Sequence, residues 1–390
     1  MPFPNTPTKP NLNTPINTPT GDTKTTSSTT GRLPIHHIFA TNRMPVEDAD
    51  AQERHPEVLQ WAEKIQGGDR SSITKTGSDQ KIKNRSQEYA DANEDTWTKM
   101  FFAALKKETR DRNVVGEWST VQWDQDGLRE VWNQLFQKNS IPKIDTSDAA
   151  TEAILNKYPR IKRPKPDITY GLSSKEFSNE MMTINRLYYE QAGICPSLWH
   201  PFCIVEANMK GRIEDAIYQC VRGGAALVNA ARQLKFLSGD LKLTTSGADL
   251  LTPVFSLAAV PTSIALQVHW AEVDSKGQTW FHMHHVYTYA LRNRGEGKKL
   301  RHDLNNILDW GTLSRKDDII TMLTKISDAH IAGTIRQLPT PEVTEVDEDK
   351  DCGDNDSDAD VFADAIEGTD QAGEDGASRG DKKRKLDERA

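Results

Sequence analysis

The sequence lacks several features that would mark a familiar class of protein. No uninterrupted apolar run reaches about 18 residues, so a transmembrane helix is not expected. The N-terminus lacks the basic-then-apolar pattern of a secretory signal. There is no P-loop, dinucleotide-binding fingerprint or GxSxG motif, which argues against the enzymes that these motifs mark. The four cysteines, Cys195, Cys203, Cys220 and Cys352, form no close CxxC pair, so we expect an intracellular protein with reduced thiols, the first three buried.

The net charge of −8 is unevenly distributed. Residues 341–390 contain 18 acidic and 7 basic residues, a balance of −11, which leaves about +3 for the other 340 residues. The mildly basic remainder permits a phosphate-bearing partner without requiring one. The chain ends with the run Lys382, Lys383, Arg384 and Lys385. A basic run in an accessible tail resembles a nuclear import signal, so we expect the nucleus, and the cytoplasm if the run is not used.

Composition divides the chain into four segments. Residues 1–45 are rich in Thr and Pro and contain too little apolar surface to offset chain entropy, so this tail is expected to be disordered. Residues 46–94 form a helical and polar lead-in, and residues 95–340 form the folded domain. Residues 341–390 are acidic and low in apolar residues, which predicts a second disordered tail.

Hydrophobic periodicity predicts an α/β fold for the folded part. Helical spacing of apolar residues is found over 58–65, 97–105, 128–136, 177–189, 214–238 and 319–326, with a further capped helix over 145–155. Short apolar runs bounded by turn signals predict strands over 167–170 and 201–208, and alternation over 250–293 predicts two more strands. The turn Asp274-Ser275-Lys276-Gly277 would join those two as a hairpin.

Two acids, Asp167 and Glu206, lie at the ends of the first two predicted strands. An acid at the end of a buried strand is costly unless it is paired, hydrogen-bonded or bound to a cation. The structural alternatives are that Asp167 caps a turn and that Glu206 pairs with a basic residue in the core. The helix that follows is apolar on most sides and contains Gly223-Gly224, which indicates close packing against a sheet.

The order of these features resembles the PD-(D/E)XK nuclease superfamily. Pro166-Asp167 is followed by a strand that ends in Glu206-x-Asn208 and then by a helix containing Gln219. The longer pattern also includes Lys165, Ile168, Ile204, Val205 and Gly223 to Asn229, and it is similar to an uncharacterised fungal domain family thought to be related to those nucleases. The resemblance covers about residues 95–335 and implies a restriction-endonuclease-like mixed β-sheet flanked by helices.

The resemblance also implies a hydrolase that cleaves nucleic acid with Mg²⁺. Asp167 and Glu206 would be the metal ligands, with the carbonyl of Ala207 as a third. Mg²⁺ takes oxygen ligands and keeps several waters, and it lowers the pKa of a bound water. Gln219 falls where some members place a helix glutamine near the site, although an ordinary helix amide is the alternative.

The sequence departs from the family pattern at Asn208, where the superfamily has a lysine that orients the attacking water. An amide can hydrogen-bond to water but carries no charge. Lys210 lies two residues further on, and in an extended strand it would point to the same side as Asn208. Either Lys210 substitutes from a shifted position or the site is degenerate.

A rival metal site is suggested by histidines in the predicted hairpin. His282 and His284 would share one strand face, His285 would take the other, and His269 would lie across the hairpin. Three imidazoles can bind Zn²⁺, but no nearby Cys or carboxylate completes a clear spacing, which favours ordinary sheet histidines.

Together these patterns predict a nuclear nucleic-acid phosphodiesterase, or a degenerate relative, acting on DNA or RNA. The first alternative is an inactive module that binds nucleic acid or a protein through the same fold. The second is a chromatin-associated protein whose acidic tail binds basic nuclear proteins. No membrane partner is expected.

Overall fold

The structure is a computed structural model of the whole chain. It describes residues 39, 42–46, 53, 55–67, 94–105, 123–125, 127–142, 162–192, 194–195, 198–240, 247–248 and 252–334. All of these lie in one compact unit, Pro34–Ala390. The acidic tail, most of the Thr/Pro-rich tail, the predicted helix over 145–155 and Cys352 lie outside the described residues.

The centre of the fold is a mixed sheet of eight strands. The order is β1-β2-β3-β4-β6-β7-β5, and β8 also pairs with β7. Among the strands that the structure describes, only β4 and β6 run parallel, while the other paired strands are antiparallel. A parallel pair needs a long crossover connection, and helix α8 supplies it. The strands are β1 (Trp123–Gln125), β2 (Leu128–Trp132), β3 (Ile168–Leu172), β4 (Trp199–Ala207), β5 (Gly247–Ala248), β6 (Val254–Val260), β7 (Ser263–Val273) and β8 (Thr279–Ala290).

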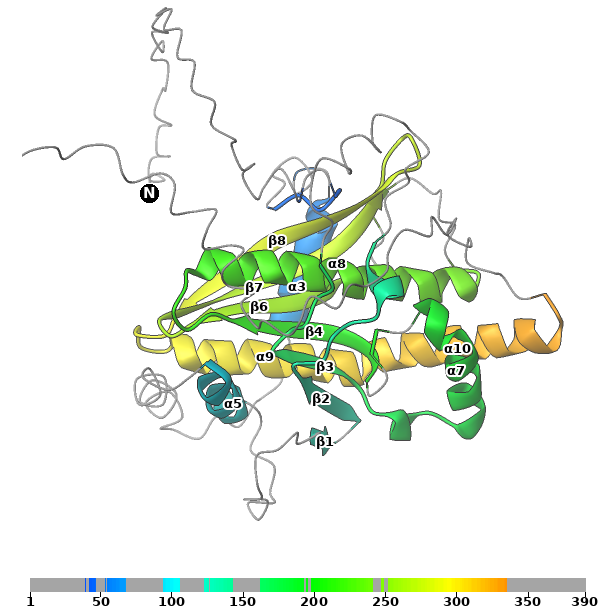
Figure 1. Cartoon of the computed structure of the whole chain (residues 1–390), viewed down its shortest axis with the longest axis horizontal. Helices are drawn as coiled ribbons and strands as arrows, with labels where there is room; N and C mark the ends of the chain where they lie inside the picture. Colours follow the sequence, from blue (N-terminus) through cyan, green and yellow to red (C-terminus); the bar gives the residue numbers. More distant parts are fainter. Residues whose placement is uncertain are drawn as a thin grey trace, which may run out of the picture. The chain divides into compact units, whose positions relative to one another are not determined.

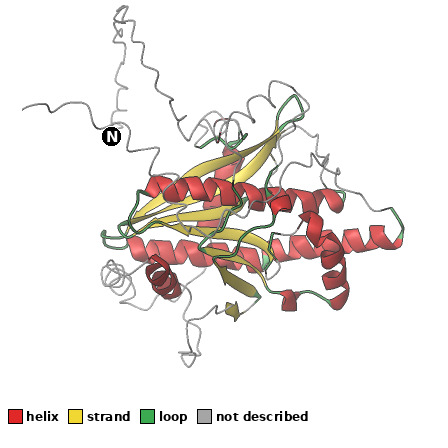
Figure 2. Cartoon of the chain, in the orientation of Figure 1, coloured by secondary structure: helices red, strands yellow, loops and turns green. Residues whose placement is uncertain are grey.

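Helices flank this sheet, so the predicted α/β class is confirmed (Figures 1 and 2). Helix α8 packs on β4, β6 and β7, while α9 contacts α3, α5, β3, β4 and β8. Helix α10 packs against α7 and α9. The helices are α3 (Pro56–Gln66), α5 (Glu94–Leu105), α7 (Asn179–Ala192), α8 (Ile213–Leu237), α9 (Glu296–Thr312) and α10 (Ser314–Ile331), with short 3-10 turns at Lys138–Ser140 and Ser174–Glu176.

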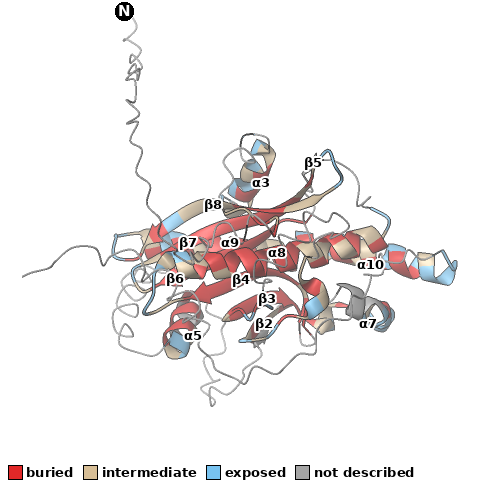
Figure 3. Ribbon diagram, turned by 45° about the horizontal axis from the view of Figure 1, so that its top comes forward, coloured by how far each residue is buried: buried red, intermediate tan, exposed pale blue. Residues whose placement is uncertain are grey.

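The strands that carry the core are buried on both faces, which explains their long apolar runs (Figure 3). The glycine pair of α8 lets this helix approach the sheet closely. A Cβ at Gly223 would lie 2.3 Å from Cδ1 of Ile204, and one at Gly224 would lie 2.3 Å from Nδ1 of His269. The close packing expected from these glycines is confirmed. Cys195, Cys203 and Cys220 are buried free thiols, as predicted.

The helix predicted over residues 128–136 is wrong. Leu128–Trp132 form strand β2, which pairs antiparallel with both β1 and β3. Sheet pairing on both sides overrides a helical spacing carried by only a few apolar residues. Helix α9 was not predicted, although its buried Leu300, Leu304, Ile307 and Leu308 have helical spacing, because polar residues fill the positions between them.

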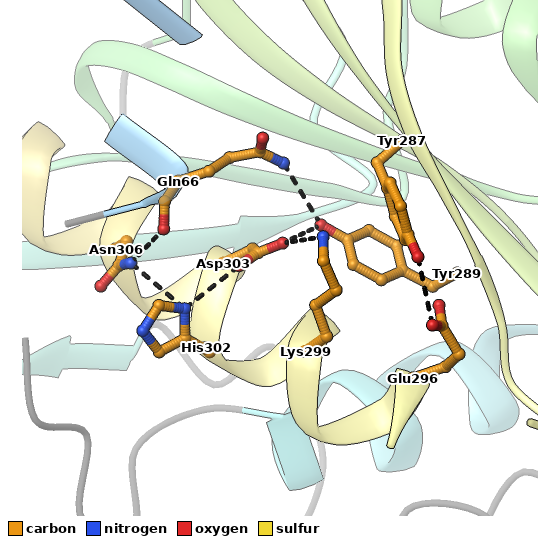
Figure 4. A network of polar contacts seen from close by, with 8 residues as sticks. All are labelled: Gln66, Tyr287, Tyr289, Glu296, Lys299, His302, Asp303 and Asn306. Atoms are coloured by element: carbon orange, nitrogen blue, oxygen red, sulfur yellow. Dashed lines mark hydrogen bonds and ion pairs between the residues drawn. The ribbon is translucent and has the colours of Figure 1, made fainter. Parts of the chain in front are cut away.

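A network of polar contacts joins α3, β8 and α9 (Figure 4). Tyr289 Oη donates to Asp303 Oδ2 at 2.6 Å, and Lys299 Nζ lies 3.0 Å from the same oxygen. Asn306 Nδ2 donates to the carbonyl of Gln66 at 2.5 Å, which ties the end of α3 to α9. No helix among the described residues is long and apolar enough to cross a membrane.

Candidate active site

The two predicted acids come from neighbouring strands. Asp167 directly precedes β3, and Glu206 is the penultimate residue of β4. The register places Ile168 opposite Val205. Asp167 and Glu206 take the next position of this antiparallel register, so they lie opposite each other. Asp167 Oδ2 accepts a hydrogen bond of 2.6 Å from the backbone N–H of Ala207. The fold therefore brings both carboxyl groups together at one end of β3 and β4.

The environment of this acidic pair, Asp167 and Glu206, disfavours the state in which both carboxyl groups are ionised. Burial raises the pKa of Asp167 from 3.8 to about 7, against the lowering effect of its hydrogen bond from Ala207. Burial and then the charge of Asp167 hold the pKa of Glu206 well above its usual range. Glu206 is only 5% exposed. In isolation the pair keeps protons that ordinary surface carboxylates release.

A third acid, Glu94, approaches the pair from the first turn of α5. Its charge raises the pKa of both Asp167 and Glu206. Glu94 Oε2 also accepts a hydrogen bond of 3.1 Å from the N–H of Met209, just beyond the end of β4. Asp95 adds a further negative charge near Asp167. The sequence pattern missed Glu94, whose only signal was an acid at the start of a predicted helix.

Positive charge reaches the acidic pair from α8 and from the chain before β3. Arg222, which is 8% exposed on α8, lowers the pKa of Glu206, and Lys165 lowers the pKa of Asp167. The signal for Arg222 was present in the sequence, because it is one of two arginines that interrupt a mostly apolar helix. Neighbouring Cys220 is buried, and burial followed by the charge of Glu206 raises the pKa of its thiol.

Asn208 is committed to the turn between β4 and α8. Its Oδ1 accepts a hydrogen bond of 2.6 Å from the N–H of Gly211, and its Nδ2 lies 3.4 Å from Asp215 Oδ2. Strand β4 ends at Ala207, one residue before the predicted end at Asn208, so Lys210 lies beyond the strand. Lys210 is exposed in a bend, because the turn held by Asn208 begins before it. Gln219 lies on α8 and is half-buried.

The histidines of the predicted hairpin do not converge. His269 pairs with Met283 across β7 and β8, which places it on the sheet face opposite His282. His269 therefore lies across the hairpin from β8, as predicted, but on the other face of the sheet from His282. His269 Nε2 lies 2.7 Å from Ser256 Oγ, and His282 Nε2 lies 3.2 Å from Glu272 Oε2.

Within the described part of the chain, no three His, Cys, Asp or Glu side chains are grouped in a way that could hold a metal ion by themselves. Two carboxylates still suffice for Mg²⁺, which is usually bound through one or two carboxylates, with waters and substrate phosphates completing its shell.

Comparison with known proteins adds a family but no activity. A family model described as a domain of unknown function, DUF7924, matches residues 81–323. The match begins before the helix that carries Glu94 and includes Asp167, Glu206 and the whole of α8. Searches of curated proteins and of solved structures found no match.

Proposed function

The chain belongs to the family of the DUF7924 domain, and we propose that it is a divalent-cation-dependent phosphodiesterase acting on DNA or RNA, of the PD-(D/E)XK type. The observation that carries the proposal is the acidic pair. Its two carboxyl groups lie at the adjoining ends of β3 and β4, with pKa values raised by burial and, for Glu206, by repulsion from Asp167. Such a pair lowers the stability of the folded state unless a bound cation compensates for it. Acids with perturbed pKa values cluster at functional sites.

The residues present fit Mg²⁺. Asp167 and Glu206 would hold it as carboxylates, and a bound dication offsets the burial and repulsion that keep their protons in place. Their oxygens are the ligand type that this hard cation prefers. When bound, Mg²⁺ would lower the pKa of a coordinated water and offset charge on the phosphoryl oxygens.

The chain's own residues have distinct roles in this proposal. Arg222 lies close enough to lower the pKa of Glu206, so it supplies fixed positive charge on the helix side of the pair. Lys165 does the same for Asp167 from the exposed side. These two cations would offset negative charge on a phosphate in place of the lysine that the superfamily has at position 208.

The alternative function is a non-catalytic module that binds nucleic acid or a protein through the same surface. The specific observation in its favour is Asn208, whose amide holds a turn instead of facing a reacting water. A third role, binding of basic nuclear proteins by the acidic tail, rests on residues 341–390, which lie outside the described part of the chain.

Cleavage assays on the full chain separate these functions. The protein is incubated with single- and double-stranded DNA and RNA in Mg²⁺, Mn²⁺ or EDTA. We expect weak metal-dependent cleavage that Asp167→Asn abolishes. The matched control, Asp274→Asn, changes an aspartate of the β7–β8 turn and should leave cleavage intact.

Substitutions at Asn208 and Lys210 test which residue supplies positive charge to the site. Asn208→Lys should raise the rate by about a hundredfold, since one well-placed donor to developing charge is worth that much. Loss of wild-type cleavage in Lys210→Ala would assign the role to Lys210 instead of Arg222. If neither the wild type nor Asn208→Lys cleaves any substrate, the catalytic proposal fails and the binding module replaces it.

A further inference from the structure

A cavity of about 90 Å³ lies at the end of β4 opposite the acidic pair. This volume is several times what one water needs, so the cavity can hold a small organic molecule. Its walls come from α3, α7, β4, α8, α9 and α10. The lining residues that define its chemistry are Trp61, Trp199, His200, Ala231, Trp310 and Arg315.

Arg315 brings a buried cation to this cavity. The residue is 6% exposed, and its Nη1 donates a hydrogen bond of 3.2 Å to the carbonyl of Pro253. The guanidinium lies over the ring of Trp310 at 5.4 Å from the centroid. Its Nε is buried without a hydrogen-bond partner among the described residues. A buried guanidinium with an unused donor is destabilising unless an acceptor occupies the site.

No carboxylate in the described part of the chain neutralises Arg315 by direct contact. Asp318 also lines the cavity and raises the pKa of Arg315 through space, but no salt bridge joins the two. Burial still lowers the pKa of Arg315 to about 10, so the guanidinium is charged at neutral pH. The cavity therefore carries a positive charge that the described residues do not fully compensate.

His200 supplies a second unused polar atom. Its Nε2 is buried without a hydrogen-bond partner among the described residues. Burial and then the charge of Arg315 lower its pKa to about 3, so the imidazole is neutral. The backbone of His200 is left-handed, with φ at 44°, which is uncommon outside glycine and tends to persist at functional sites.

We propose that this cavity binds a small organic carboxylate with an apolar body. The planar guanidinium of Arg315 matches a carboxylate, and the Nε side of its fork is unused. The indole rings of Trp61, Trp199 and Trp310 supply apolar walls for the rest of the ligand. A phosphate carries about twice the charge of a carboxylate, and the cavity has few donors to pair with it. The cavity therefore favours the carboxylate. The site is separate from the acidic pair, which attracts cations.

Titration of the full-length protein with four probes tests this proposal. Benzoate and butyrate are small apolar carboxylates, benzamide is the uncharged counterpart of benzoate, and phenyl phosphate presents the other anion. Binding is measured by calorimetry and by the rise in melting temperature that accompanies it. We expect one site for benzoate or butyrate and at least tenfold weaker binding of benzamide, since a hydrogen bond to a charged group contributes at least that much.

Two variants locate the binding. Arg315→Gln should weaken benzoate or butyrate binding by about tenfold or more. Ala231→Leu leaves the charge in place but fills the cavity, so it should abolish binding; this variant decides the matter if Arg315→Gln fails to fold. The proposal is overturned if neither carboxylate binds, if benzamide binds equally well, if only phenyl phosphate binds, or if Ala231→Leu has no effect. None of these readouts depends on nucleic-acid cleavage.

Discussion

Replacing Asp167 with asparagine should make the metal-free protein more stable at alkaline pH. Burial raises the pKa of this carboxyl from 3.8 to about 7, so the folded state keeps a proton that the unfolded chain has released. A carboxyl with a raised pKa in the folded state costs stability as the pH rises from its unfolded to its folded value. The wild type should therefore lose stability between about pH 4 and pH 7 through Asp167, whereas the variant keeps only the contribution of Glu206 and should lose less.

The size of the effect follows from the shift. From 3.8 to about 7 is roughly three units, and at about 1.4 kcal/mol per unit this corresponds to about 4 kcal/mol. Asparagine keeps an oxygen that can accept the hydrogen bond from the N–H of Ala207, so little is lost in exchange. The free energy of unfolding of Asp167→Asn, minus that of the wild type, should rise by up to about 4 kcal/mol from pH 4 to pH 8.

Urea denaturation in EDTA at several pH values measures this difference. Asp274→Asn is the control of opposite sign. Burial acts to raise the pKa of Asp274. Hydrogen bonds from Gln278 N–H, Trp280 Nε1 and Lys276 N–H outweigh it and hold this pKa below its usual range. Its stabilisation is present above the unfolded pKa and lost as the pH falls, so this variant should be least stable relative to the wild type at neutral pH. A difference for Asp167→Asn that stays flat or falls with rising pH would mean that the folded state does not raise the pKa of Asp167.

Three further predictions concern the packing of α8 on the sheet, the polar contacts of α9 with α3 and β8, and localisation. Gly224→Ala forces a Cβ onto the ring of His269 and should lower the free energy of unfolding by about 1–3 kcal/mol in urea, whereas no loss would mean that the ring moves freely. Asp303→Asn weakens the polar network of α3, β8 and α9 and should cost about 2 kcal/mol, against little change for the exposed Asp317→Asn. Removing Lys382–Lys385 should move a fluorescent fusion too large for passive diffusion from nucleus to cytoplasm, and unchanged nuclear retention would contradict the import assignment.

Elements with local signals could be predicted from the sequence. Helix α8 follows a turn, is apolar on most sides and approaches the sheet through Gly223 and Gly224, as expected. The β7–β8 hairpin follows from alternation around the turn at Asp274. Strand β2 could not be predicted, because its five residues are fixed by pairing with β1 and β3 and not by their own periodicity.

The acidic pair was visible in the sequence, but its surroundings were not. Asp167 and Glu206 stand out as acids that end apolar runs. Glu94 and Arg222 approach them from two helices far apart in sequence, and only the packing of α5 and α8 brings them close. The position of Lys210 depends on where β4 ends, which the turn held by Asn208 decides. Side chains that converge through tertiary packing leave no spacing pattern to find.

Calorimetric titration of Mg²⁺ and Mn²⁺ into the full chain measures whether the acidic pair holds a cation. Near neutral pH the acidic pair still holds protons, so cation binding should release them, and the measured heat should depend on the ionisation enthalpy of the buffer. We expect binding with proton release in the wild type and its loss when Asp167→Asn and Glu206→Gln are combined. Absence of binding to the wild type, or equal binding to the double variant, would contradict it.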